Sequence, residues 1–182
     1  SGDRVHARTH ARRIDLSHPE EHLSSVNSLL HQTPPFMLPF VLLLPPTTAK
    51  GGFLPHWLLF ISVVSIFNSI QNYVIKDLTL TRKVYSSAPA SEVTNLSART
   101  FGTWTFLTSI VRFYGAYNII GNAQMYNLCI WTFVIAGGHF LSEWLVFKTC
   151  KLDKGLAGPL VVASSSLAWM LSQRDFYVGS LA

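Results

Sequence analysis

Two side chains able to bind metal or transfer protons, His139 and Glu143, lie four residues apart in an apolar stretch. That spacing puts both on one face of a helix, where they could supply two ligands to a zinc ion. A zinc site takes three or four protein ligands. Five of the other histidines precede residue 32 and the sixth is His56, so they add no cluster within an apolar stretch. We therefore expect no metal site and no cofactor.

Sequence motifs of common enzymes are missing. The chain has no GxSxG, P-loop, GxGxxG or HExxH pattern, and none of the histidine boxes of membrane oxidases and desaturases. Cys129 and Cys150 form neither a metal nor a disulfide pattern. We assign no catalytic residue and expect a protein that is not an enzyme. An enzyme with an unfamiliar site is an alternative that turnover by the isolated protein would reveal.

The third residue with distinctive chemistry is Arg112, inside the apolar stretch TFGTWTFLTSIVRFYGAYNII (residues 100–120). A charge near the middle of a membrane span costs at least a few kcal/mol on insertion scales. Either this stretch does not cross a membrane, or Arg112 has a partner or reaches water.

Composition favours a membrane protein. The chain is 49% hydrophobic and 13% charged, whereas roughly 25% of residues are charged in typical globular proteins. No charge lies between Lys50 and Lys76, and uncharged apolar runs of about 20 residues predict membrane helices. The net charge of +5 does not indicate nucleic acid, because the basic residues are in the first thirteen positions or mostly flank the apolar runs.

The sequence predicts an all-α polytopic membrane protein with four transmembrane helices in a small bundle. The expected helices are residues 57–75, 98–120, 125–147 and 156–171, within a membrane domain of residues 53–175. Asn95 or Ser97 is the expected N-cap of the second helix. Residues 176–182 are expected to form a short C-terminal tail.

Residues 1–52 are expected to be a disordered extension, because histidine, arginine, serine and proline dominate the first 35 positions. The segment PPFMLPFVLLLPP (residues 34–46) is too short and too rich in proline to span a bilayer. Met37 is a candidate for the natural start.

Orientation follows from the basic residues near the helix ends. The loops after the first and third helices hold seven of them, Lys76, Arg82, Lys83, Arg99, Lys148, Lys151 and Lys154, whereas the other side has Lys50 and Arg174. By the positive-inside rule these two loops face the cytosol. The sequon Asn95-Leu96-Ser97 offers a test, because its glycosylation would reverse this topology.

Polar and small residues repeat at helical spacing in three of the spans. They are Ser62, Ser65, Asn68, Ser69 and Asn72 in the first, Thr105, Thr108, Ser109 and Arg112 in the second, and Thr132, Ala136, His139 and Glu143 in the third. Such stripes turn inward in a bilayer, because lipid cannot satisfy polar groups. The candidate helix-packing or partner-contact residues are Asn68, Asn72, Arg82, Arg99, Arg112, His139 and Glu143.

Several longer segments resemble a known family. They are LPHWLLFISVVSIFNSIQNY (54–73), LTRKVY (80–85), LSARTFGTWTF (96–106), RFYGAY (112–117), HFLSEWLVFKTCKL (139–152) and GPLVVASSSLAWM (158–170). In this order, without a large gap, they resemble the ergosterol biosynthetic protein 28 family. The resemblance covers the chain from about residue 52 onward, and the N-terminal extension departs from it.

The resemblance implies a small, non-catalytic protein of the endoplasmic-reticulum membrane. Members of this family are scaffolds that hold together the sterol C-4 methyl oxidase, the 4-carboxysterol decarboxylating dehydrogenase and the 3-keto sterol reductase. Contacts with the sterol C-24 methyltransferase are also attributed to the family. The alternative is a sterol- or lipid-binding membrane protein that uses the polar helix stripes as a pocket.

Helix geometry predicts the surroundings of Arg112. It lies thirteen residues beyond Arg99, or about 20 Å along a helix, whereas Glu143 is only about 8 Å from the basic end of its own helix. An ion pair between Arg112 and Glu143 is therefore not expected. We expect Arg112 to reach the lumenal headgroups, or to bond backbone carbonyls and hydroxyls at its own level, near Ser62, Ser65 and Ser166.

Overall fold

The computed structural model describes residues 44–48 and 51–179. Apart from Leu44, these residues belong to one unit, Pro45–Ala182. Most of the expected N-terminal extension, including Met37 and the proline-rich apolar segment up to residue 43, lies outside the described residues. So do residues 180–182 of the expected tail.

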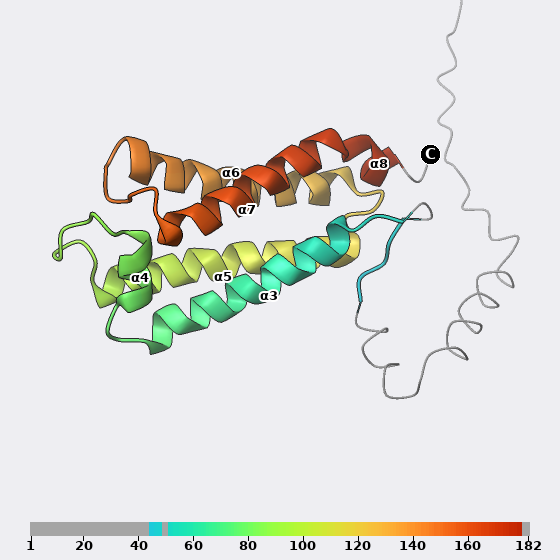
Figure 1. Ribbon diagram of the computed structural model, residues 1–182. Helices are drawn as coiled ribbons and strands as arrows, with labels where there is room; N and C mark the ends of the chain where they lie inside the picture. Colours follow the sequence, from blue (N-terminus) through green and yellow to red (C-terminus); the bar gives the residue numbers. More distant parts are fainter. Residues whose placement is uncertain (1–43, 49–50, 180–182) are drawn as a thin grey trace, which may run out of the picture. The chain divides into compact units, whose positions relative to one another are not determined.

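Helices make up nearly all the regular structure of the described residues, which confirms the all-α prediction (Figure 1). The four long helices are α3 (Leu54–Val74), α5 (Asn95–Asn118), α6 (Ala123–Leu145) and α7 (Lys154–Ser172). Each begins two or three residues before its expected start, because the polar residues or proline of its first turn look like a loop in sequence. Two short helices, α4 (Thr79–Val84) and α8 (Arg174–Val178), were not predicted.

Side-chain caps fix the starts of three long helices. Thr94 caps α5 in a reciprocal capping box with Ser97, so the expected cap at Asn95 or Ser97 was wrong. Asn122 caps α6 by accepting the Met125 N–H, and Asp153 caps α7 by accepting the Gly155 N–H. These caps set the starts of α5, α6 and α7.

The long helices pack as two pairs, α3 with α5 and α6 with α7, and α5 also packs on α6 (Figure 1). Successive long helices run in opposite directions, so the loops alternate between the two ends of the bundle. The α3–α5 connection, which contains α4, and the α6–α7 loop share one end, here called the basic end. The seven basic residues named above lie at or near it.

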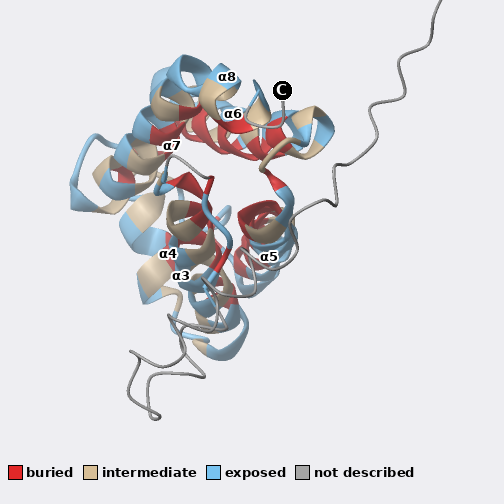
Figure 2. Ribbon diagram, turned by 90° about the vertical axis from the view of Figure 1, so that its right-hand side faces the viewer, coloured by how far each residue is buried: buried red, intermediate tan, exposed pale blue. Residues whose placement is uncertain are grey.

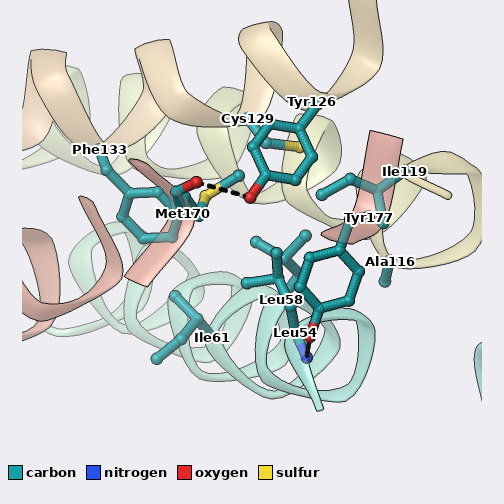
Figure 3. Packing of buried hydrophobic residues seen from close by; sticks show 10 residues of the cluster. All are labelled: Leu54, Leu58, Ile61, Ala116, Ile119, Tyr126, Cys129, Phe133, Met170 and Tyr177. Atoms are coloured by element: carbon teal, nitrogen blue, oxygen red, sulfur yellow. Dashed lines mark hydrogen bonds between the residues drawn. The ribbon is translucent and has the colours of Figure 1, made fainter. Parts of the chain in front are cut away.

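A hydrophobic cluster closes the opposite end of the bundle (Figure 3). Tyr177 of α8 is buried there; its hydroxyl accepts the Leu54 N–H at 3.1 Å, and its carbonyl accepts the Gly121 N–H at 2.8 Å. The Tyr126 hydroxyl donates to the Met170 carbonyl at 2.7 Å. Residues 174–178 are therefore a packed helix, in contrast to the tail expected from residue 176 onward.

Three of the helices, α3, α6 and α7, are long and apolar enough to cross a membrane. The chain is therefore a polytopic membrane protein with three candidate spans among the described residues. Buried residues of the bundle lie on the faces that the helices turn toward one another, and exposed residues lie on the outer faces (Figure 2). Large apolar side chains are exposed on every long helix, among them Phe67, Leu107, Trp131 and Val161.

Candidate functional sites within the helix bundle

Arg112 joins three helices at the centre of the bundle. It is 5% exposed on α5. Its Nε donates to the Thr132 hydroxyl of α6 at 3.0 Å, and a terminal nitrogen donates to the Thr132 carbonyl at 3.2 Å. The other terminal nitrogen donates to the Ser65 hydroxyl of α3 at 3.5 Å. The guanidinium also lies 4.3 Å from the ring centre of Phe133, a cation–π distance.

The bonds to hydroxyl and carbonyl oxygens, including Ser65, match one of the two expectations for Arg112. The other, a side chain reaching the lumenal headgroups, is wrong because the residue is buried. Ser166, an expected neighbour, instead accepts a bond from the Trp57 indole at 2.9 Å and so joins α7 to α3. Within the described residues the only contact of a carboxylate with a basic side chain is Glu143 with His139, so Arg112 has no carboxylate partner there.

A cavity of about 300 Å³ adjoins Arg112 between the long helices. Most of its lining is apolar, from Ile61 on α3 through Phe133 on α6 to Val162 on α7. Its polar lining comes from two helices, with Ser65 and Asn68 on α3 and Thr105, Thr108 and Arg112 on α5. We call this space the Arg112 cavity.

A second pocket, of about 480 Å³, lies at the basic end between α4, the following loop, α5 and α6. There the Tyr85 hydroxyl lies 2.7 Å from His139 Nε2, and His139 Nδ1 lies 3.9 Å from a Glu143 carboxylate oxygen. The other Glu143 oxygen accepts a bond from Thr149. The Trp104 ring packs edge-on against the His139 ring, with 5.5 Å between their centres.

Burial raises the pKa of the Tyr85 phenol, and nearby Cys150 and Glu143 raise it further. The phenol therefore stays protonated and shares a hydrogen bond with His139 Nε2. The Glu143 carboxylate faces Nδ1 and favours a proton there, which leaves Nε2 to accept from the phenol. The arrangement positions the imidazole, and no group of three or more potential metal ligands occurs among the described residues.

The other predicted site residues are separated. Asn72 is buried; its amide donates to the Asn68 carbonyl and its oxygen accepts from Thr81, which ties α4 to α3. Arg82 and Arg99 are exposed at the basic end. The structure therefore brings Asn68 and Arg112 together at one cavity and His139 and Glu143 together at the other, and leaves Arg82 and Arg99 outside both.

Sequence reasoning missed two residues of these sites. Tyr85 lies just after α4 and contacts His139 across 54 residues of chain, so no local spacing pointed to it. Trp104 lines both pockets but is only partly buried on α5. Thr132, the main partner of Arg112, already belonged to the predicted stripe of the third span, so its inward orientation was available from periodicity.

Comparison with known proteins places these features in a family. The family model described as Erg28 like protein matches residues 54–168, which include all four long helices except the last residues of α7. The chain belongs to the Erg28 family. Ergosterol biosynthetic protein 28 of Candida albicans is 62% identical over 139 residues, which are 76% of this chain and 96% of that protein.

Other Erg28 relatives are more distant. The Saccharomyces cerevisiae protein of the same name is 56% identical over 128 residues, 70% of this chain and 84% of that protein. The Homo sapiens ergosterol biosynthetic protein 28 homolog is 41% identical over 119 residues, 65% of this chain and 82% of that protein. No solved structure matches the chain significantly.

Proposed function

We propose that this Erg28 family member acts in sterol biosynthesis as a non-catalytic membrane scaffold. Its proposed partners are the sterol C-4 methyl oxidase, the 4-carboxysterol decarboxylating dehydrogenase and the 3-keto sterol reductase, with the sterol C-24 methyltransferase as a further contact. The observation that carries the proposal is the family match across residues 54–168. The names of the relatives connect the family with ergosterol biosynthesis.

A scaffold of this kind acts through proximity. Enzymes held side by side meet an apolar intermediate at a higher effective concentration than enzymes that diffuse separately in the bilayer. The exposed apolar side chains on all four long helices supply outward faces that membrane partners can pack against. The proposed location is the endoplasmic-reticulum membrane, with the basic end in the cytosol.

We further propose that α5 is the fourth span. Its 24 residues extend about 36 Å, more than the ~30 Å hydrocarbon core. The residues that lower its hydropathy, among them Thr105, Thr108, Ser109 and Arg112, are buried against the other helices. The face left for lipid carries Phe106, Leu107, Ile110 and Phe113, all exposed. The polar side chains of α5 therefore meet protein and its apolar side chains meet lipid.

The scaffold role is tested by removing the gene and by purifying its product in mild detergent. We expect loss of the gene to raise 4-methyl and 4-carboxy sterols, because the enzymes that act on them are no longer adjacent. We expect the tagged full chain to co-purify the three C-4 demethylation enzymes, with an unrelated multi-pass protein of the same membrane as control. An unchanged sterol profile together with purification of the chain alone would exclude the scaffold role.

Variants of the outer faces sharpen the test. Phe67→Leu, Phe113→Leu and Trp131→Leu each keep an apolar side chain toward lipid but change the shape that a partner meets, on α3, α5 and α6 respectively. We expect at least one of them to lower recovery of one enzyme several-fold at unchanged melting temperature. Val161→Leu on α7 adds a single methylene group to an exposed side chain and is the matched control.

A further inference from the structure

Arg112 uses only some of its hydrogen-bond donors inside the bundle, and no negative charge lies beside it there. A guanidinium has five N–H donors, and three hydrogen bonds from Arg112 are present, all to neutral oxygen atoms of Ser65 and Thr132. Buried charges in proteins are normally paired with an opposite charge, and those in membranes mark functional sites. None of the carboxylates in residues 44–48 and 51–179 pairs with Arg112.

A second polar group faces the same cavity from another helix. Asn68 on α3 lines the Arg112 cavity, and its side-chain amide makes no hydrogen bond within the described part of the chain. A cation and a free amide therefore converge on a space whose other walls are mostly apolar. Small-molecule sites in proteins have this composition, with a few polar groups that orient a largely apolar ligand.

The Arg112 cavity is elongated and can be reached from the outer surface of the bundle. Its lining on α5 runs from Arg112 to Phe101, eleven residues or about 16 Å along the helix. Val64 on α3 is 48% exposed, and Gly158 on α7 is exposed as well. Both belong to the lining, so the space can be reached from the outer surface of the bundle between these helices. A molecule dissolved in the bilayer can enter there without passing through water.

We propose that the Arg112 cavity binds a slender apolar molecule with a single carboxylate. The carboxylate accepts bidentate hydrogen bonds from Arg112 and one from the Asn68 amide, and the apolar body extends toward Phe101 and Trp104. One guanidinium balances one negative charge, and its fork matches a carboxylate. At about 300 Å³ the cavity is at the small end of ligand sites and suits one chain or one fused-ring body rather than a two-chain phospholipid.

Two kinds of molecule share this chemistry, a fatty acid and a sterol that carries a ring carboxylate. Binding is measured on the full chain in phosphatidylcholine nanodiscs with two probes, palmitic acid and a steroid carboxylic acid, each beside its methyl ester. We expect at least one acid to bind tenfold or more tightly than its ester. The acid with the larger preference identifies the source.

Three variants connect the preference to the cavity. Arg112→Gln removes the charge and is expected to abolish the preference for acid over ester. Arg99→Gln removes an exposed arginine from the same helix and is expected to leave it unchanged. Ala136→Leu fills the cavity from α6 while Arg112 stays in place, so it is expected to lower acid binding even if Arg112→Gln does not fold.

Equal affinity for acid and ester in the wild-type chain would overturn the proposal. So would unchanged acid binding in a folded Arg112→Gln chain or in Ala136→Leu, or a co-purified phospholipid that neither acid displaces. The proposal does not depend on the scaffold role. A negative binding result would not affect the co-purification test of the scaffold role, and a negative co-purification result would not affect the binding test.

Discussion

Most hydroxyl side chains of the polar stripes bond within their own helix. Ser69 donates to the Ser65 carbonyl, Thr105 to Phe101 and Thr108 to Thr105. Ser62 and Arg112 are different, because they donate across helices, Ser62 to the Ser109 carbonyl at 2.8 Å. At the scale of single residues, the stripes therefore act mainly by being small and already satisfied, and a few bonds fix how the helices meet.

The carboxylate of Asp153 is expected to make the stability of the protein depend on pH. This carboxylate accepts bonds from Ser86 and from the Gly155 N–H, and these lower its pKa from 3.8. When folding lowers the pKa of a carboxyl group, the folded state is stabilised at pH values above the pKa of that group in the unfolded chain. This stabilisation is lost as the pH falls through the pKa in the folded chain. We expect wild type to melt at a higher temperature than Asp153→Asn at about pH 7, and the difference to shrink near pH 3.

Asparagine is itself a good helix cap, so Asp153→Asn isolates the charge from the cap. Ser86→Ala removes the bond that lowers the pKa most and should behave similarly. A melting difference that stays the same at both pH values would contradict the prediction.

At the scale of the helices, glycine residues allow neighbouring helices to approach closely. A Cβ built on Gly115 of α5 would collide with the Cys129 sulfur of α6. One built on Gly102 would lie 3.1 Å from the Cβ of Asn72 on α3. Glycine on one helix thus makes room for a side chain on the next, which brings α5 close to both α3 and α6.

We predict that Gly115→Ala destabilises the bundle by about 1–3 kcal/mol, the usual cost of overpacking. Alanine otherwise favours a helix over glycine, so a loss must come from contact with Cys129. Adding Cys129→Ala should recover part of the loss. Gly138→Ala is the matched control, because nothing lies within 4 Å of its Cβ. Thermal melting in detergent measures all three variants, and an equal loss in both single glycine variants would contradict the packing argument.

At the scale of the whole molecule, most lysines and arginines of the described residues gather at one end of the bundle. The basic end carries seven lysines and arginines, in the α3–α5 and α6–α7 connections or in the first turns of α5 and α7, whereas the far end is closed by the buried tyrosines Tyr126 and Tyr177. By the positive-inside rule, this asymmetry predicts that the basic end faces the cytosol. If α5 crosses the membrane, the connections before and after it must lie on opposite sides.

Cysteine labelling tests both the orientation and the α5 span. Ser91→Cys and Gln124→Cys place thiols at exposed positions on either side of α5, while the native Cys129 and Cys150 are buried. In sealed microsomes an impermeant maleimide should label Ser91→Cys directly and Gln124→Cys only after detergent is added. Labelling of both without detergent would contradict an α5 span, and glycosylation of Asn95 would reverse the orientation.

Periodicity and charge were enough to predict the four long helices and the inward faces of the polar stripes on three of them, because a bilayer constrains both strongly. Hydropathy alone detects three spans and misses α5. The mean hydropathy of α5 includes Arg112 and the threonines, although these side chains are buried against other helices and do not face lipid. The short helices α4 and α8 have too few residues for a periodic signal. The contacts of Tyr85 with His139 and of Tyr177 with Leu54 join distant parts of the chain, so only a structure reveals them.

The contacts of Tyr177 also constrain the order in which the protein can be made. A ribosome synthesises this residue after all four long helices, yet its hydroxyl binds the first backbone amide of α3 and its carbonyl binds the α5–α6 turn. During translation these two amides, at Leu54 and Gly121, must find other partners. Closure of this end of the bundle therefore comes after synthesis of all four long helices, and a nascent chain that stalls before Tyr177 lacks both of these contacts.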